Sequence, residues 1–392
     1  MSRASSIALG EIMATKSGSV DPSKFTEETF DLYSIPAFDR GEPEIAAGSA
    51  IGSAKQVVEP GDVLLSKIVP HIRRSWIVGK QRGRRIIASG EWIVFRSERA
   101  HPDYLRQVLV GDPFHTQFMN TVAGVGGSLL RARPAHVAKI AILLPPLAEQ
   151  RRIAEVLDRA EALRAKRRAA LAQLDSLTQS LFLHLFGDPA TNPKGWPVAR
   201  VGDVADVQGG LQVTTARKNL PREVPYLRVA NVYRGFLNLS EIKTIRATDA
   251  EVARTKLVKD DLLIVEGHGN PAEIGRGALW DGSIAGCIHQ NHIIRARFAA
   301  TKVVPLYACE CLNSPGGRRH LLRAGKTTTG LNTISVSEVR GTPVALPPIP
   351  VQREFARRVT AVERLKTAHR ASLAELDALF ATLQHRAFRG EL

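Results

Sequence analysis

The sequence has few cysteines, few aromatic residues and no long hydrophobic run. Three cysteines in 392 residues are too few for a disulfide framework and suit a reducing cytoplasm. Cys287 lies near His289 and His292, a spacing found in metal sites, but no paired C-x-x-C motif supports zinc, so we expect no metal. No apolar run approaches the roughly 20 residues of a membrane span, and the first residues lack a secretory core. We expect a soluble globular protein with two or three domains.

Motifs of nucleotide-dependent and DNA-modifying enzymes are also missing. The chain has no G-x-x-x-x-G-K-[ST] loop and no strand-borne G-x-G-x-x-G. A methyltransferase acting on a base amino group needs an Asn, Asp or Ser before Pro-Pro, but Leu144 and Leu346 stand there. Pro102-Asp103 and Glu241-Ile242-Lys243 could supply a nuclease set, yet their separation makes that pairing implausible. We therefore predict a chain without catalysis of its own.

Acidic residues are outnumbered, with 38 Asp and Glu against 54 Lys and Arg, a formal net charge of +16. Such an excess predicts a polyanionic partner, and nucleic acid is favoured over a membrane surface. Residues 63–90 contain no acid, and their seven cations are candidates for phosphate contact, with a solvated basic face as the alternative. These candidates are Lys67, Arg73, Arg74, Lys80, Arg82, Arg84 and Arg85.

Glycine is absent from two long stretches that are copies of each other. Leu144–Phe186 recurs without a gap as Leu346–Phe388, at a constant offset of 202 residues, so the chain is a tandem duplication. After the leading prolines, no helix breaker follows in the first copy before Gly187. Each copy therefore predicts one helix of about 40 residues, roughly 60 Å long.

Apolar residues recur along both copies in alternating steps of three and four, which predicts the seam of a coiled coil. We expect the two helices to bury their seams against each other and, if the repeats obey a pseudo-twofold axis, to run antiparallel. A core helix of a bundle is the alternative. The predicted seam positions are 153, 156, 160, 163, 170, 174, 177 and 181 in the first copy and 355, 359, 362, 365, 376, 379 and 383 in the second.

The remaining sequence forms two globular segments with short apolar runs and turn-rich loops, which predicts a mixed α/β (α+β) fold. We expect a first domain at 1–143, a first helix at 144–187, a second domain at 188–345 and a second helix at 346–392. The runs at 63–65, 76–78, 86–87 and 92–95 predict strands, and 103–121 predicts helices. Turns feeding a strand recur at 59–65 and 258–264, whereas the loops have diverged. Unlike surfaces on like scaffolds suggest two different ligands.

The second segment mixes cations with amide and aromatic groups that could reach base edges. These candidates are Arg217, Lys218, Arg222, Arg228, Asn231, Tyr233 and Arg234. His268, Asn270 and Arg276 lie in a Gly-rich loop that lets the backbone approach a ligand, and a structural turn is the alternative. Gly124–Ser128 and Lys326–Gly330 could clamp phosphates with their backbones.

The helix starts LPPLAEQRRIAEVLD and LPPIPVQREF, the end LFATLQHRAFRGEL and the opening GWPVARVGDVADVQGG together resemble the specificity subunits of type I restriction–modification systems. The resemblance covers nearly the whole chain. It implies two target-recognition domains that read double-stranded DNA, and spacer helices that carry modification subunits. S-adenosylmethionine, ATP and Mg²⁺ would belong to modification and restriction partners. The expected docking residues are Gln150, Arg151, Arg164, Arg167, Gln352 and Arg353.

Two other classes of function remain as alternatives: a coiled-coil scaffold that binds only protein, and a single-chain DNA enzyme. The second copy departs from the first at Pro350 and Val351, where the first has Ala148 and Glu149. This difference bears on whether the two copies bind their modification subunits equally. If the family resemblance holds, two unlike domains predict a bipartite, asymmetric DNA target with an unread spacer.

Overall fold

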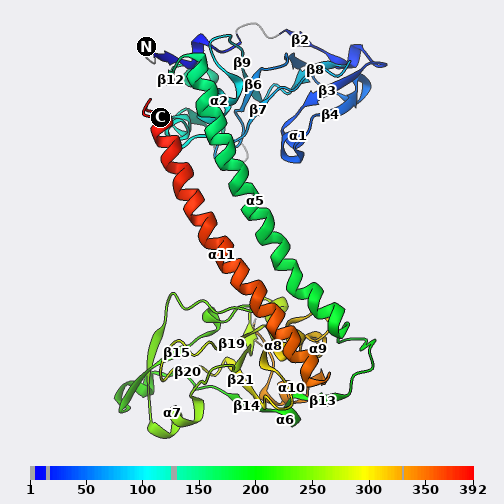
Figure 1. Cartoon of the computed structure of the whole chain (residues 1–392), viewed down its shortest axis with the longest axis vertical. Coiled ribbons are helices and arrows are strands. Elements are labelled where there is room, and N and C mark those ends of the chain that lie inside the picture. The colour runs from blue at the N-terminus through cyan, green and yellow to red at the C-terminus, as the bar shows by residue number, and fades with distance from the viewer. Residues whose placement is uncertain (1–4, 15–17, 125–129, 329–330) are drawn as a thin grey trace. The chain divides into compact units, whose positions relative to one another are not determined.

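The computed structural model describes residues 5–14, 18–124, 130–328 and 331–392, and for 326–328 and 331 it describes the backbone alone. The chain divides into two compact units. Unit 1 contains residues 1–168 and 371–392, and unit 2 contains residues 169–370. Both boundaries fall inside long helices, so each helix belongs partly to one unit and partly to the other (Figure 1). The predicted limits of the recognition domains stay a prediction.

Unit 1 is built on a five-stranded and a three-stranded sheet. The larger sheet has the order β2 (Ser19–Val20), β5 (Lys55–Val57), β8 (Arg85–Ala88), β3 (Thr29–Tyr33) and β4 (Glu44–Ala47). The smaller has the order β7 (Ser75–Ile77), β6 (Val63–Ser66) and β9 (Trp92–Phe95). Two strand pairs complete it, β1 (Ser5–Ala8) with β12 (Ala141–Leu144), and β10 (Val122–Ala123) with β11 (Arg131–Ala132). Its short helices are α1 (Ile35–Arg40), α2 (Pro102–Val110), α3 (Asp112–Met119) and α4 (Pro134–Val137).

Unit 2 repeats this plan with different lengths. Its four-stranded sheet has the order β14 (Ala205–Gly209), β21 (Ile293–Phe298), β17 (Leu262–Val265) and β19 (Gly277–Leu279). Two three-stranded sheets are β16 (Lys243–Ala247), β15 (Arg222–Leu227) and β20 (Ile288–His289), and β18 (Gly267–His268), β23 (Leu331–Thr333) and β22 (Lys326–Thr328). β13 (Val198–Arg200) pairs with β24 (Pro343–Ala345). The short helices are α6 (Val201–Val204), α7 (Asp249–Thr255), α8 (Pro305–Asn313), α9 (Arg319–Ala324) and α10 (Val336–Gly341).

Apolar runs form the central strands of both units, as their sequence predicts. Every residue of β6 and β17 is buried. A strand that is covered on both faces carries a continuous apolar run instead of an alternating one. The runs at 76–78, 86–87 and 92–95 also form strands, and 103–121 forms α2 and α3. These predictions of local structure are confirmed.

The two long helices are α5 (Leu147–Phe186) and α11 (Ile349–Ala387). Leu144, which the sequence placed in the first helix, instead ends β12, and the first helical bond is accepted by the Pro146 carbonyl. The helix starts after the prolines because proline lacks the N–H that a preceding turn would need. α5 ends before Gly187, which adopts the left-handed φ of 79° common at a helix C-terminus.

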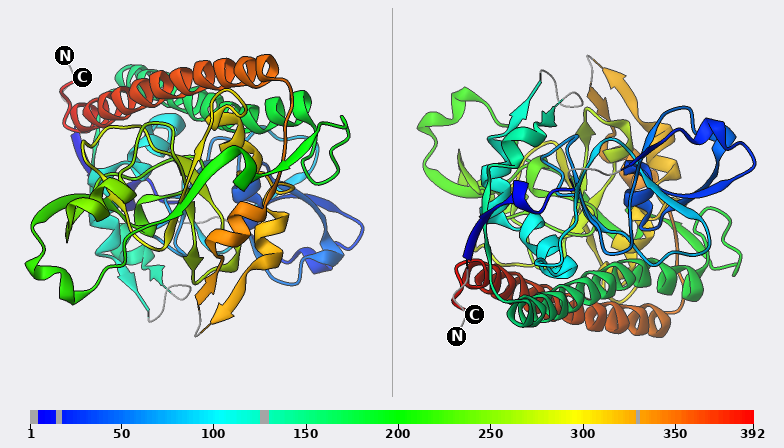
Figure 2. Two further views of the ribbon diagram at one scale, coloured as in Figure 1. Left: turned by 90° about the horizontal axis from the view of Figure 1, so that it is seen from below. Right: turned by 90° about the horizontal axis from the view of Figure 1, so that it is seen from above.

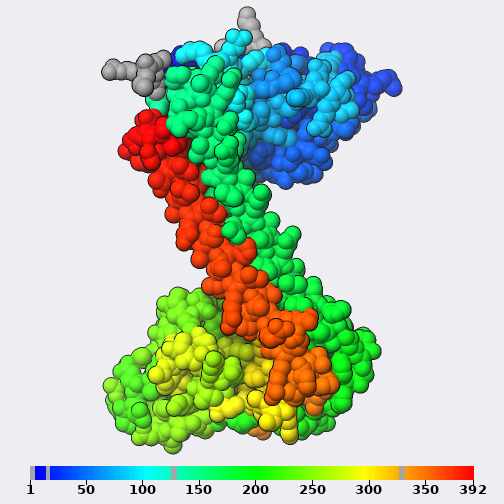
Figure 3. Space-filling view, viewed as in Figure 1, coloured from blue at the N-terminus to red at the C-terminus, as the bar shows by residue number. Residues whose placement is uncertain are grey.

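The helices run antiparallel within each unit. In unit 2 the Phe182 and Phe186 rings contact Phe355, and Asp175 pairs with Lys366. In unit 1 Arg164 pairs with Asp377 and lies over the Phe380 ring. Residue numbers along α5 therefore decrease in the direction in which residue numbers along α11 increase. Figure 3 shows the orange part of α11 along the surface of unit 2.

The predicted seam is correct in part. Ile153, Ala160, Phe355, Val359 and Val362 are buried. Leu163, Leu177, Leu365 and Leu379, however, are 51%, 39%, 53% and 50% exposed. The seam uses the neighbouring polar residues Arg164 and Lys366, which are held there by ion pairs between the helices. The apolar residues with this spacing therefore include a second set, which is exposed at the surface.

The duplication extends to individual contacts and confirms the predicted fold class, a mixed α/β tandem repeat with an antiparallel helix pair. The Tyr104 hydroxyl donates to the Leu143 carbonyl at 2.8 Å, and the Tyr307 hydroxyl donates to the Ala345 carbonyl at 2.9 Å. Each tyrosine ring also contacts the aromatic residue at the end of the other domain's helix, Phe388 in unit 1 and Phe186 in unit 2. Among the described residues, no helix is long and apolar enough to cross a membrane.

Candidate nucleic-acid interface

A buried carboxylate fixes the strand that precedes the recognition loops in each unit. Asp62 pairs with Arg96 through two bonds of 2.7 and 2.6 Å, and Asp261 pairs with Arg297 at 2.7 and 2.8 Å. Each carboxylate also accepts a backbone N–H three residues before it. The hydrogen bonds from Asp62 raise the pKa of Arg96, and those from Asp261 raise the pKa of Arg297. These ion pairs lie directly before β6 and β17 and so fix where the two strands begin.

Four of the seven predicted cations in unit 1 are paired within the unit. Arg73 pairs with Asp112, Arg74 with Asp39, Arg84 with Asp31, and Arg85 with Glu28. The Arg74 ion pair holds the pKa of Asp39 below its usual range. Because their charge is locally neutralised, these arginines offer less attraction to phosphate than the sequence alone suggests.

Lys67, Lys80 and Arg82 are the other three candidates. Within the described part of the chain, no ion pair engages their side chains, and Lys80 and Arg82 are exposed in the loop between β7 and β8. The Lys67 carbonyl accepts the Ala132 N–H at 2.8 Å, which places Lys67 beside the β10–β11 pair. This pair extends from the body of unit 1 in Figure 2. The predicted phosphate clamp Gly124–Ser128 falls, except for Gly124, outside the described residues.

In unit 2 the predicted arginines make similar internal pairs. Arg217 binds Glu251 through two bonds of 3.0 and 2.9 Å, which lower the pKa of Glu251 to about 2. Arg228 pairs with Glu241 and lowers its pKa. Lys218, in contrast, is exposed in the same turn as Arg217, and among the described residues no ion pair holds it. Lys218 is therefore the more available phosphate contact.

Two predicted DNA-binding residues of unit 2 are corrected by the structure. Asn231 is 2% exposed, and its side chain accepts the Arg228 N–H and donates to the Asn238 and Glu241 carbonyls. Arg276 is 6% exposed, pairs with Glu273 and lies 4.9 Å over the Tyr233 ring. Both residues are used inside the unit because loops need internal partners for their buried polar groups.

The other candidates of unit 2 lie in short strands and loops. His268 accepts the Asn270 N–H at 3.0 Å, and the exposed Asn270 caps a short turn. Arg234 donates to the Asn313 and Ala272 carbonyls. Lys326 begins β22, whose backbone pairs with β23, and its side chain lies outside the described part. The β22–β23 pair extends from the body of unit 2, shown in orange in Figure 2.

The candidate docking residues separate into three groups. Gln150 and Gln352 are fully buried, which corrects their assignment. Each amide donates to a proline carbonyl before its helix at 2.7 Å and accepts the N–H that precedes α2 or α8. Arg164 is used in the ion pairs between the helices. Arg151 and Arg353 are exposed on the first helical turns, and Arg167 has further interactions within the structure.

No family model matches the chain, but curated relatives do. It is 28% identical over 284 residues to the type I restriction enzyme EcoKI specificity subunit of Escherichia coli, a match covering 68% of this chain and 61% of that one. It is 26% identical over 310 residues to the StySPI specificity subunit of Salmonella potsdam, covering 74% and 65%. The curated relatives that the chain resembles are thus specificity subunits of type I restriction enzymes. The matches span less than two thirds of these relatives' own length.

Solved structures share the fold of this chain across nearly its whole length. A chain from a study entitled "Structural basis underlying complex assembly and conformational transition of the type I R-M system" aligns with a TM-score of 0.62 at 22% identity, covering 99% of this chain and 98% of that one. The type I restriction–modification S subunit from M. genitalium aligns with a TM-score of 0.56 at 10% identity, covering 98% and 96%. The sequence resemblance to the family is thus confirmed.

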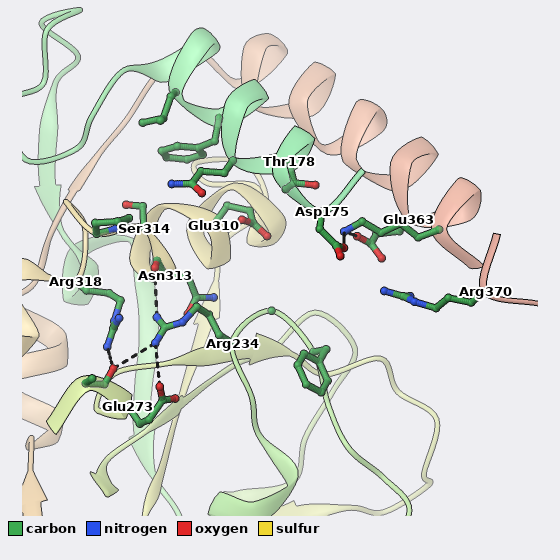
Figure 4. A pocket seen from close by; sticks show the side chains of 18 residues that line it. Asp175, Thr178, Arg234, Glu273, Glu310, Asn313, Ser314, Arg318, Glu363 and Arg370 are labelled. Carbon is green, nitrogen blue, oxygen red and sulfur yellow. Dashed lines mark hydrogen bonds and ion pairs between the residues drawn. The ribbon is translucent and has the colours of Figure 1, made fainter. Parts of the chain in front are cut away.

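Unit 2 of this specificity-subunit fold contains a pocket of about 890 Å³ that the sequence did not indicate. Figure 4 shows side chains from both long helices, α8 and the loop at 234–236 around it. Glu310 and Thr178 line it, and neither was predicted as a functional residue. A signal existed for Glu310, because the corresponding position in the first repeat is the uncharged Gln107.

Proposed function

We propose that the chain is the DNA sequence-specificity subunit of a type I restriction–modification complex, and that it reads a bipartite, asymmetric target. The observation that carries this proposal is that two units with one framework expose different charged loops. The buried carboxylate, the buried glutamine and the tyrosine bond recur in both units, whereas the recognition loops do not. Like scaffolds with unlike surfaces suit two different half-sites.

Contact with DNA begins with phosphates. The net charge of +16 supports sequence-independent attraction, and Lys67, Lys80, Arg82 and Lys218 are the cations that internal ion pairs leave most available among the described candidates. Base contacts then come from loop residues around β10–β11 in unit 1 and around β18, β22 and β23 in unit 2. Replacing the phosphate-binding cations should weaken binding to all sequences and flatten its salt dependence by about one unit per lost contact.

The proposed subunit has no catalysis of its own and binds no cofactor. Its partners are two modification subunits, which use S-adenosylmethionine, and restriction subunits, which use ATP and Mg²⁺. The missing methyltransferase and nucleotide-binding motifs support this division of work. Arg151 and Arg353 begin the exposed faces on which modification subunits would dock.

The test of the proposal is a map of methylated bases in cells that carry the modification subunit with variants of this chain. Exchange of residues 1–143 for the corresponding domain of a relative should change one half-site and keep the spacer. Insertion of four residues near Ala169-Ala170 lengthens α5 by about 6 Å and should change the spacer by one or two base pairs while keeping both half-sites. The proposed division of roles is wrong if the insertion rewrites the half-sites or the exchange alters both.

A further inference from the structure

Four acids and four cations line the pocket in unit 2, and among these described residues Glu310 is the acid that makes no ion pair. Lys366 donates to Asp175 at 3.0 Å and to Glu363 at 2.8 Å, so one ammonium serves two carboxylates. Glu310, a third acid, lines the same pocket, and no hydrogen bond or ion pair within the described chain engages its carboxyl group. Burial raises the pKa of Glu310, the nearby charge of Glu363 raises it further, and the ammonium of Lys366 lowers it. A cation in direct contact with Glu310 would stabilise its charged form.

Two of the arginines on the pocket wall are already occupied. Arg234 and Arg318 donate to the Ala272 carbonyl, and Arg234 also lies near Glu273, as the dashed lines in Figure 4 show. Arg370 lines the pocket, but no ion pair in the described chain engages it. Its counterpart in the first repeat, Arg168, pairs with both Glu161 and Asp377.

Unit 1 satisfies the equivalent position internally. Gln107 occupies the place of Glu310, three residues after the tyrosine that recurs in both units, and it donates to Asp158 of α5 at 2.6 Å. The residue of α11 at the place of Asp158 is Thr360, which is exposed and bonds to its own helix. The duplication has thus placed a carboxylate in unit 2 that makes no hydrogen bond or ion pair within the described chain, although Lys366 lies near enough to act on it electrostatically.

A second polar group in the pocket is also unpartnered. Thr178 on α5 is 9% exposed, and its hydroxyl makes no hydrogen bond although it is buried. A buried hydroxyl without a partner is costly, so an incoming donor at this wall would be favourable. At the rim, Phe236 and Leu183 are 58% and 42% exposed, which adds apolar surface beside the acidic groups.

We propose that this pocket receives an arginine or lysine side chain of a protein partner, whose cationic end pairs with Glu310 and whose apolar surroundings pack on Phe236 and Leu183. The inference rests on the proposed function, which makes a modification subunit the partner. Phosphate is disfavoured because Asp175, Glu310 and Glu363 would repel it. A free polyamine would leave the exposed apolar rim uncovered.

The test measures affinity between the full chain and the modification subunit. Glu310→Gln should weaken binding by about tenfold or more, because it removes one partner of a desolvated charge pair. Glu310→Lys should weaken it further through repulsion. Glu223→Gln, an exposed glutamate elsewhere in unit 2, is the matched control and should stay within about twofold. Thermal unfolding of each variant checks that it folds, and Glu310→Gln should keep the melting temperature because the group it neutralises is unpaired.

The other possible occupants are measured on the chain alone. Spermidine that binds wild type but not Glu310→Gln would assign the pocket to free amines and overturn the inference. DNA affinity that rises about tenfold in Glu310→Lys but not in Glu223→Lys would assign it to phosphate and also overturn it. If Glu310→Gln matches its control while wild type assembles normally, the inference fails and the proposed function stands. If wild type binds no modification subunit, both fail.

Discussion

Units 1 and 2 keep the same internal contacts and differ where their loops meet solvent. Gln150 and Gln352 occupy the same place, with the same two kinds of bond, although the domains around them have diverged. Directly after β6, however, unit 1 has Lys67, and directly after β17 unit 2 has Glu266. The backbone carbonyl of each accepts an N–H from the neighbouring chain segment. The comparison teaches that duplication preserved the buried polar contacts and left the surface free to change.

The ion pairs between the long helices show the same division. Arg164 binds Glu161 and Asp377 in unit 1, and Lys366 binds Glu363 and Asp175 in unit 2. The acids are the same in both repeats, which is why they stood out in the alignment. The second cation differs in use, since Arg168 joins this cluster and no described pair engages Arg370.

The largest effect is expected from the framework ion pairs. Arg96→Ala and Arg297→Ala each leave a buried carboxylate unpaired and should lower the free energy of unfolding by about 3–5 kcal/mol. Urea denaturation followed by tryptophan fluorescence measures the loss. Arg40→Ala, which removes an exposed pair with Glu44, is the control and should cost less than about 1 kcal/mol. Costs that differ widely between Arg96 and Arg297 would break the equivalence of the units.

A smaller effect is expected from the buried glutamines. Gln150→Ala and Gln352→Ala each leave a buried N–H and a proline carbonyl without partners, so each should cost about 1–3 kcal/mol. Gln173→Ala, at an exposed position of α5, should change stability little. The same denaturation experiment compares the three. A neutral result at either buried position would contradict the structural role assigned to it.

The helix ion pairs should separate the two units. Asp377→Ala removes the partner of two arginines and should cost about 1 kcal/mol, whereas Asp175→Ala removes the partner of one lysine and should cost about half as much. Melting temperatures at low and high salt measure both, because screening should reduce each effect. Equal costs would mean that Arg168 adds nothing in unit 1.

A pH-dependent effect is expected at Glu266. Burial raises the pKa of this carboxyl group to about 7, so the folded state favours its protonated form. Stability from this group should be present below the unfolded pKa of about 4.5 and should be lost as pH rises through 7. Glu266→Gln should remove this loss and raise the melting temperature at pH 8 relative to wild type. Melting curves between pH 4.5 and 8 that keep the same slope in the variant would contradict the assignment.

Much of the architecture could be predicted from the sequence. A long stretch without glycine or internal proline predicts a helix wherever it folds, and its gapless recurrence predicts two of them. Apolar runs such as Val63–Leu65 predict buried strands because their side chains have no favourable place at the surface. The net charge and the missing motifs predict a DNA-binding chain without catalysis, which remains a proposal.

The choice of individual contacts was decided only by the tertiary structure. Arg74 and Arg84 look like Lys80 and Arg82 in the sequence, but Asp39 and Asp31, more than 30 residues away, neutralise the first two. Leu163 fits the period of a helix seam, yet it is exposed, and the half-buried Arg164 lies between the helices because Asp377 faces it. The sequence determines periodicity and total charge, which are properties of neighbouring residues. Pairing and burial depend on which distant residue arrives opposite, and only the folded chain decides that.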